Sequence, residues 1–319
     1  MYAYIARRLL LVIPTLILAS LVVFLVMRAL PGDVTAAILG GEGEALNPEL
    51  VRALRAELGL DDPLHVQYFR WARSMLSGEL GGRSLQTGEP IRSLVARELP
   101  ITLQLAFYTV VVAALIAIPL GALAAARHNE WPDAAVRVVT VAGASLPGYW
   151  VALVALLGLV TASRWYPPLV YVSFRESPLE HLQLMALPTL VLAWGYGAHL
   201  VRITRAQTIE ALGQDYVRTA RAKGLGGLAV LVRHALRTSL IPVVTAAGLN
   251  IGALLGGAAV LENIFGIPGM GRGIVQAVIA RDYPVVQSLA VLSVAVVLAV
   301  NVLIDALYAY LDPRVSPGG

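Results

Sequence analysis

Ser145 and His199 are the residues whose types best suit covalent catalysis, because an imidazole can take the proton of a serine hydroxyl and free the oxygen to attack. Ser145 lies in the stretch GASLPG, which lacks the Gly-x-Ser-Gly pattern of intramembrane serine proteases. No third residue fills the role of orienting the imidazole. A serine in an apolar helix ordinarily hydrogen-bonds across a helix interface, so the sequence favours a structural role for Ser145.

The sequence indicates neither a metal site nor a nucleotide site. The histidines show no metal-ligand spacing, and the chain has no cysteine to supply a thiolate. A phosphate-binding loop needs a glycine-rich turn ending in Gly-Lys-Ser or Gly-Lys-Thr, whereas Lys223, the single lysine, follows Ala222 and precedes Gly224. The five histidines are His65, His128, His181, His199 and His234. We therefore expect no cofactor on this chain.

The stretch DYVRTARAKGL, residues 215–225, has the features of a short capped helix. Asp215 suits a helix N-terminus and Arg221 suits a C-terminus, because of the helix dipole. Gly224 suits the left-handed residue that closes many helices. Val217 and Ala220 recur with Gly224 at helical spacing. The stretch therefore predicts an ordered helix with one apolar side.

Small side chains make this predicted helix a candidate docking element. Thr219, Ala220 and Ala222 would let the surface of another protein approach the backbone closely. The alternative is a purely electrostatic role, since basic residues beside a membrane helix also mark its cytoplasmic side and contact anionic lipid in any order. The candidate docking residues are Asp215, Tyr216, Val217, Arg218, Thr219, Ala220, Arg221, Ala222, Lys223, Gly224 and Leu225.

The elements around this stretch are those of a membrane protein. Hydrophobic residues make up 58% of the chain and charged residues 14%, against about one quarter charged in soluble domains. Six apolar runs have lengths near the roughly 20 residues that a helix needs to cross a hydrocarbon core. Lipid forces such runs to be helical. They span residues 9–29, 101–126, 138–163, 184–201, 240–261 and 285–307. The predicted fold class is an all-α membrane protein with six transmembrane helices.

Arginines in the short loops predict the topology, because they mark the cytoplasmic side. Arg7 and Arg8 precede the first run, Arg127 and Arg137 lie between the second and third, and the loop at 202–238 carries several more. Both termini are therefore expected in the cytoplasm. The net charge of +4 does not indicate a nucleic-acid partner, because the arginines are scattered and not interleaved with aromatic residues.

Residues 31–100 are expected outside the membrane, because a segment of this length crosses largely regardless of its arginines. One short helix is predicted to begin near Asn47 and Pro48. A second is predicted within DDPLHVQYFRWARSMLSGELG, where apolar residues recur at helical spacing. We interpret this segment as a helical cap on the outer mouth, within a single domain of residues 1–319.

The run DYVRTARAKGLGGLAVLVRHALRTSLIP resembles the cytoplasmic signature of ABC-importer permeases, specifically the B-type subunit of the dipeptide, oligopeptide and nickel group. The general signature has Glu-Ala-Ala, a glycine four residues beyond the last alanine, and a later Leu-Pro. Here residues 218–220 are Arg-Thr-Ala, Gly224 is kept, and residues 236–237 are Leu-Arg, departures that themselves resemble the peptide and nickel group. Further stretches similar to this family follow in order along the chain, among them YIARRLLLVIPTL, LPGD, RELPITLQLA and ENIFGIPGMGRGIVQAVIARDYPVVQ.

The resemblance implies a type I importer permease that forms half of a translocation pathway. A homologous C-type permease would form the other half, and an extracytoplasmic solute-binding protein would deliver the solute. Two cytoplasmic ATP-binding cassette ATPases, holding ATP and magnesium, would drive transport, and residues 215–225 would seat in one of them. The chain would lie among the lipids of a bacterial or archaeal cytoplasmic membrane. The sequence does not separate dipeptide, oligopeptide, nickel chelate, glutathione and sugar as the solute.

An ion-coupled secondary transporter is the alternative class, since buried ionisable groups can relay protons. Asp305 and His199 are its candidates, but no inverted repeat of broken helices is evident. Other polar and aromatic residues in the predicted helices could line a pathway, although we favour interhelical hydrogen bonding and packing for them. These pathway candidates are Trp194, Tyr196, His199, Asn250 and Asn301.

Overall fold

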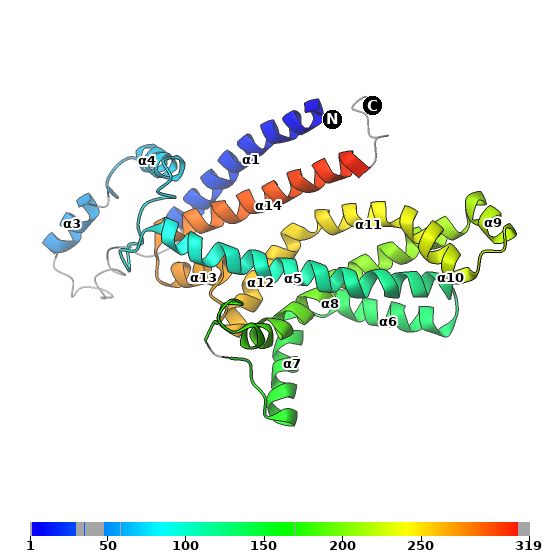
Figure 1. The fold of residues 1–319 in the computed structure, drawn as a ribbon. Helices are drawn as coiled ribbons and strands as arrows, with labels where there is room; N and C mark the ends of the chain where they lie inside the picture. The colour runs from blue at the N-terminus through cyan, green and yellow to red at the C-terminus, as the bar shows by residue number, and fades with distance from the viewer. Residues whose placement is uncertain (1, 30–34, 36–47, 58, 169, 312–319) are drawn as a thin grey trace. The chain divides into compact units, whose positions relative to one another are not determined.

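A computed structural model describes residues 2–29, 35, 48–57, 59–168 and 170–311 (Figure 1). The regular elements of these residues are helices, as the sequence predicts. In chain order they are α1 (Tyr2–Ala29), α3 (Pro48–Glu57), α4 (Leu64–Leu76), α5 (Ile91–Ala126), α6 (Trp131–Ser145), α7 (Gly148–Ser163), α8 (Pro178–Leu212), α9 (Asp215–Ala222), α10 (Gly227–Val230), the π-helical turn η1 (Leu231–Leu236), α11 (Arg237–Leu249), α12 (Ile251–Phe265), α13 (Met270–Ile279) and α14 (Tyr283–Leu311).

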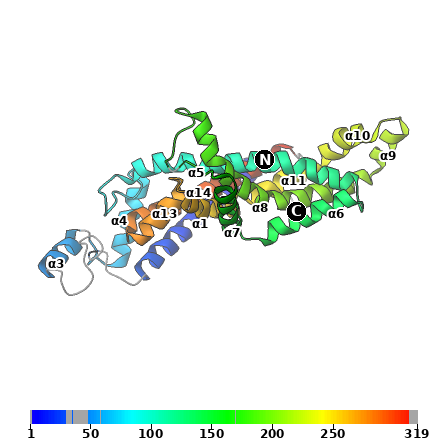
Figure 2. The same ribbon diagram turned by 90° about the horizontal axis from the view of Figure 1, so that it is seen from below.

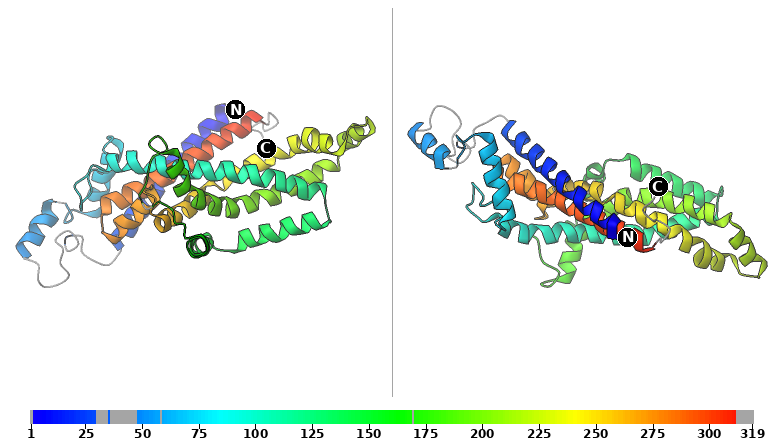
Figure 3. Two further views of the ribbon diagram at one scale, coloured as in Figure 1. Left: turned by 60° about the horizontal axis from the view of Figure 1, so that its bottom comes forward. Right: turned by 90° about the horizontal axis from the view of Figure 1, so that it is seen from above.

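The chain forms two compact units. Unit 1 comprises Met1–Ile5, Leu103–Ile267 and Ala299–Gly319, and unit 2 comprises Ala6–Thr102 and Pro268–Leu298. Within unit 1, α8 is the central helix, because α6, α7, α11 and α12 all pack against it. The long contact of α6 along α8 can be followed in Figures 1 and 3.

Small residues bring α5 and α8 close together in unit 1. A Cβ atom added to Gly121 would lie 2.7 Å from Cβ of Thr204 and 2.9 Å from the carbonyl oxygen of Val201. Gly197 lies against Ala113 in the same way, at 3.6 Å from an added Cβ. Close packing of this kind drives helix association where lipid removes the hydrophobic force. The apolar face of α8 therefore packs against neighbouring helices of unit 1.

Unit 2 has its own apolar core. Ile91 of α5 and Leu289 of α14 are fully buried there, together with Met27 of α1. The loop before α5 is fixed by Asp282, whose carboxylate accepts a hydrogen bond of 2.5 Å from the hydroxyl of Ser84. These contacts join segments far apart in the sequence into one unit.

Five helical segments in the described residues are long and apolar enough to cross a membrane, and two bent helix pairs raise the number to as many as seven. The predicted number of six lies within this range. The five segments are Leu10–Ala29, Ile91–Ala126, Pro178–Leu212, Gly227–Leu249 and Tyr283–Ile304.

Two of the predicted runs are not continuous helices. Run 138–163 is divided between α6 and α7, with a bend of 106° between them, because Pro147 lacks an N–H group and disfavours a helical conformation at Leu146. Run 240–261 is divided between α11 and α12 at Asn250. The side-chain amide of Asn250 donates to the carbonyl of Ala246 at 2.7 Å. A short polar side chain of this kind competes with the helical ladder.

Both helices predicted in the outer segment are present, as α3 and α4. The helix α3 begins at Pro48, as expected, and α4 begins directly after Pro63. Trp71 of α4 is buried in unit 2, where its indole N–H donates to the hydroxyl of Ser288 at 3.4 Å. The segment therefore contains both predicted helices, and α4 packs within unit 2 through Trp71. Residues 36–47 lie outside the described part of the chain.

Candidate functional site

The helix predicted within residues 215–225 is present as α9, beyond the end of α8 and the beginning of α11 (Figures 1 and 2). Its C-terminus is closed by two hydrogen bonds. The N–H of Leu225 donates to the carbonyl of Ala220 at 3.3 Å, and the N–H of Gly224 donates to that of Arg221 at 2.9 Å. Gly224 has φ +83°, a conformation that glycine adopts without steric cost. The predicted left-handed glycine is confirmed.

Two side chains hold α9 on unit 1. Val217 is fully buried and Ala220 is 5% exposed. They form a small apolar cluster with Val230 of α10, and Leu212 at the end of α8 packs against it. The apolar side of α9 is thus used to fix the helix between the two segments that flank it in the sequence.

The opposite side of α9 is open. Thr219 and Ala222 are exposed, and their small side chains leave the backbone accessible. Ala220 was expected to share this open side, but it is buried together with Val217, because residues three apart lie on one face of a helix. The surface available for docking is therefore narrower than the sequence suggests.

The polar groups of α9 face solvent. Oδ1 of Asp215 and Nη1 of Arg218 lie 3.1 Å apart, with 92% and 76% of the two side chains exposed. The hydroxyl of Tyr216 donates to Oγ1 of Thr238 at 3.4 Å. Arg221, Lys223 and Leu225 are exposed as well. Exposed ion pairs contribute little to stability, so these groups can exchange water for a partner at small cost.

Short connections tie α9 to two long helices. Gly213 and Gln214 join it to α8, whereas α10 and η1 continue into α11, so that Gly227–Leu249 forms one candidate membrane span. A displacement of α9 must therefore move the ends of both α8 and α11, or deform the short connections.

A second polar cluster lies where α6 begins. Arg205 of α8 donates from Nη2 to Oδ2 of Asp133 at 2.8 Å and from Nε to Oδ1 at 2.5 Å. The backbone N–H of Asn129 donates to the same carboxylate at 3.0 Å, and Nδ1 of His128 lies 3.1 Å from Nη2 of Arg205. Asp133 is fully buried by these partners. No local pattern marks this pair, because its members are 72 residues apart.

The residues proposed for a pathway on α8 point to different neighbours. The hydroxyl of Tyr196 donates to the carbonyl of Ala247 on α11 at 2.6 Å. Trp194 instead lies against Gly143 of α6. His199 contacts an arginine of its own helix, with 3.4 Å between the ring nitrogen and the guanidinium. The structure does not gather these three side chains at one place.

The other candidates are dispersed in the same way. Asn250 interrupts the helix between α11 and α12, and Oδ1 of Asn301 is buried and has no hydrogen-bond partner among the residues that the structure describes. Ser145 lies exposed at the end of α6. The side chain of Asp305 is outside the described part of the structure. A pathway role for these residues remains a prediction.

His181 is a structural residue that the sequence did not distinguish. It is fully buried, with Nδ1 at 2.9 Å from the carbonyl of Val172 and Nε2 at 3.4 Å from the hydroxyl of Tyr108. In the loop that precedes α8, hydrogen bonds from Ser173 hold the pKa of Glu176 below its ordinary value. The rings of Tyr108, Tyr171 and Phe174 surround the imidazole edge-on. His181 therefore fixes the connection between α7 and α8.

Comparison with known protein families identifies the class of protein to which this chain belongs. A family model described as binding-protein-dependent transport system inner membrane component matches residues 117–317. The N-terminal model of the same kind of membrane component matches residues 1–106. The chain belongs to this family: it is a permease subunit of an ABC importer, a multi-pass integral membrane protein and not an enzyme. Importers of this family work with ATPase and binding-protein partners.

Relatives of the same length support this assignment. The chain is 38% identical over 315 residues to a putative peptide transport system permease protein of Brucella abortus (strain 2308), covering 99% of both chains. It is 35% identical over 322 residues to the oligopeptide transport system permease protein AppB of Bacillus subtilis (strain 168), covering 99% of this chain and 100% of AppB. It is 36% identical over 315 residues to the glutathione transport system permease protein GsiC of Salmonella paratyphi A (strain ATCC 9150 / SARB42), covering 99% of both.

Proposed function

We propose that α9 is the element through which this permease subunit is coupled to a cytoplasmic ATPase. The observation that carries the proposal is the division of α9 into two sides: Val217 and Ala220 fix it to the end of α8 and to α10, which leads into α11, and Thr219 and Ala222 leave the other side open. A capped helix fixed in this way can pass a rigid-body movement to two membrane helices. ATP and magnesium would bind to the ATPase partners.

The topology follows from the same region. The Asp133–Arg205 pair brings the loop between α5 and α6 to the same end of unit 1 as the C-terminal part of α8. Both segments carry the arginines that predict a cytoplasmic location, and α9 follows α8 directly. We infer that α9 and both termini face the cytoplasm, that residues 31–100 face outward, and that the membrane is the cytoplasmic membrane of a bacterium or archaeon.

The proposed solute is a peptide or a related small solute. The relatives named above are described as permeases for peptides, oligopeptides and glutathione. A homologous C-type permease would complete the pathway, two ATPase subunits would drive it, and an extracytoplasmic binding protein would select the solute. Residues 1–319 would act as one permease domain in this complex, with 202–238 as its ATPase-facing part.

The experiment is purification of the subunit alone and with its proposed partners. Alone, it should show no ATP hydrolysis, because no residue pattern in the chain can hold the phosphates of ATP in a glycine-rich loop. Co-expressed with a C-type permease and the ATPases, it should form one complex whose hydrolysis is stimulated by solute-loaded binding protein. A stable complex that transports solute without any ATPase would contradict the proposal.

A further inference from the structure

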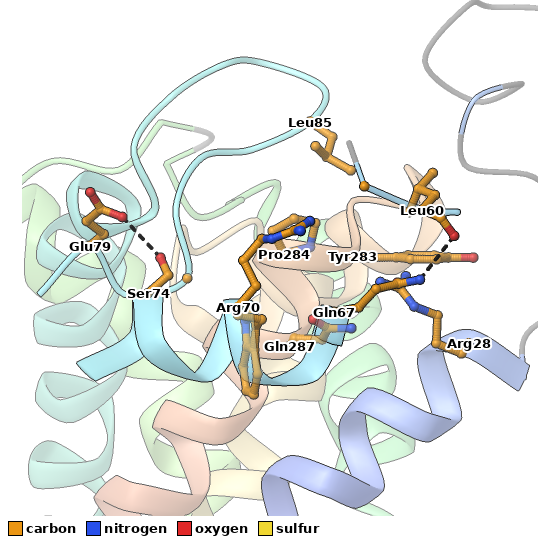
Figure 4. Close-up of a pocket in the computed structure, with 13 residues that line it drawn as sticks. Arg28, Leu60, Gln67, Arg70, Ser74, Glu79, Leu85, Tyr283, Pro284 and Gln287 are labelled. Carbon is orange, nitrogen blue, oxygen red and sulfur yellow. Dashed lines mark hydrogen bonds between the residues drawn. The ribbon is translucent and has the colours of Figure 1, made fainter. Parts of the chain in front are cut away.

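A polar cavity of about 340 Å³ lies in unit 2 between the end of α1, the helix α4 and the beginning of α14 (Figure 4). It is independent of α9, which belongs to unit 1. Figure 4 shows that side chains from all three helices converge on it. Its polar lining includes Arg28, Gln67, Arg70, Glu79 and Gln287.

Arg28 is held in this cavity by two aromatic rings. Its Cζ atom lies 5.1 Å from the ring centroid of Phe24 and 5.1 Å from that of Tyr283. Cation–π contacts of this kind attract the guanidinium through the faces of the rings and leave the in-plane N–H groups free to donate. Nε and Nη1 of Arg28 are buried, and neither has a hydrogen-bond partner in the described residues. Buried donors of a charged group normally require an acceptor.

Two glutamines add unused hydrogen-bonding groups to the same cavity. Gln67 donates from Nε2 to the carbonyls of Leu60 and Asp62 at 3.0 and 2.7 Å, which fixes its amide, and Oε1 has no partner in the described part of the chain. Gln287 is 3% exposed, and its Nε2 has no partner within the described chain. The cavity therefore offers cationic and neutral donors together with one acceptor.

The other two charged side chains of the cavity have partners: Arg70 is ion-paired, and Glu79 keeps its negative charge and accepts from a neutral hydroxyl. Nη2 of Arg70 lies 2.6 Å from Oδ2 of Asp62, and the carboxylate of Glu79 accepts a hydrogen bond from Ser74 at 3.2 Å. The ligand that fits the unpaired groups is an anion with several acceptor oxygens and a neighbouring donor. A phosphodiester joined to an alcohol or amine headgroup has this chemistry.

The position of the cavity indicates where such a phosphodiester comes from. Arg28 and Tyr283 lie at the ends of the candidate spans Leu10–Ala29 and Tyr283–Ile304, the level at which hydrocarbon gives way to headgroups. On α1, Leu21 and Leu25 are 39% and 47% exposed. They precede Arg28 by seven and three residues and so lie on one face with it.

We propose that unit 2 binds a phospholipid of the bilayer in this cavity. Arg28 and Gln287 donate to the phosphodiester oxygens, Oε1 of Gln67 accepts from the headgroup alcohol or amine, and an acyl chain descends along Leu21 and Leu25. The lipid would join α1, α4 and α14 at the membrane surface.

The test uses the intact importer complex in nanodiscs that contain phosphatidylglycerol with a photoreactive diazirine near the glycerol end of one acyl chain. After illumination, mass spectrometry of peptides locates the cross-links. We expect cross-links on α1 between residues 21 and 28, reduced about tenfold by Arg28→Gln and about threefold by Gln287→Leu, given the strengths of charged and neutral hydrogen bonds. Arg73→Gln, an exposed arginine of α4 outside the cavity lining, is the matched control and should change nothing.

Three outcomes would overturn the proposal. Equal cross-linking in wild type, Arg28→Gln and Gln287→Leu would show that the lipid is not held by these groups. Loss of the cross-links on addition of inorganic phosphate, with phosphate retained by the wild type and not by Arg28→Gln, would identify free phosphate as the ligand. Loss of the lipid cross-links on α1 when the binding protein is added would assign the cavity to a protein partner.

Discussion

The helix α9 and the junction between Asp133 and Arg205 both lie in unit 1, yet they use charge in opposite ways. In α9 the Asp215–Arg218 pair is open to water, and two small apolar side chains hold the helix in place. At the junction the carboxylate is fully buried and accepts hydrogen bonds from a guanidinium and a backbone amide. The comparison indicates that the junction stabilises unit 1, whereas α9 keeps its polar side exposed to solvent.

The largest effect on transport is expected from Gly224→Asp. An added Cβ meets nothing within 4 Å in this chain, so the folded subunit loses only the roughly 1–2 kcal/mol of a left-handed residue. The new carboxylate would, however, stand beside the side of α9 assigned to the ATPase. We expect normal membrane insertion and complete loss of transport, measured as solute uptake and as stimulated hydrolysis in proteoliposomes.

Gly226→Asp is the matched control for this variant. Gly226 is exposed, has open space around an added Cβ, and has φ −65°. The Gly226→Asp variant adds the same charge two residues away without backbone strain. If Gly224→Asp transports like the wild type, α9 acts as a topology signal and is not a coupling element.

The next largest effect, a loss of stability, is expected from substitutions at the junction between Asp133 and Arg205. Arg205→Met leaves the buried carboxylate of Asp133 without its charged donor and should cost about 3 kcal/mol of stability. Thermal unfolding of the detergent-purified complex measures this loss. Adding Asp133→Leu should restore part of the stability, because removing both charges is cheaper than leaving one unpaired. A double variant less stable than Arg205→Met would contradict a stabilising ion pair.

A smaller effect is expected from Val217→Ala. The substitution removes buried apolar volume between α9 and α10 and should cost roughly 2 kcal/mol. Because the cluster is small, the loss should be confined to α9 and appear as faster hydrogen exchange in residues 215–225, with partial loss of stimulated hydrolysis. Exchange that accelerates throughout unit 1 would show that α9 is not a separate element.

The smallest effect on stability is expected from Arg218→Ala. Its ion pair with Asp215 is exposed, so thermal unfolding should change by no more than about 0.5 kcal/mol. ATPase affinity should nevertheless fall, since Arg218 is on the polar side of α9. Unchanged affinity together with a large loss of stability would reverse the roles assigned to the two regions.

The helix α9 could be predicted from the sequence because its signals are local. Asp215, Arg221 and Gly224 specify its ends, and the structure has the helix and the positive φ at Gly224. The sequence placed Ala220 both on the apolar side with Val217 and among the small docking residues, and its contact with Val230, beyond the closing turn, decided that it is buried. Local patterns thus gave the element, and tertiary contacts decided which side remains open.

The prolines within the apolar runs, Pro147 among them, predict kinked helices, and α6 and α7 are bent at that proline. The break at Asn250 and the buried polar contacts were not predicted. Asp133–Arg205 and the contacts of His181 join residues far apart in the sequence. Their energies depend on burial by neighbours, which a single sequence does not display.

The most direct test of the coupling role of α9 is a photo-cross-link from Ala222 in the assembled, transport-competent complex. The chain has no cysteine, so Ala222→Cys carrying a maleimide-linked benzophenone labels one exposed position of α9, and Leu76→Cys, 89% exposed on α4, serves as the outer control. We predict a product with the ATPase subunit from Ala222→Cys and none from Leu76→Cys. Absence of an ATPase product from Ala222→Cys, or reaction of that cysteine with an impermeant maleimide in intact cells, would contradict the account.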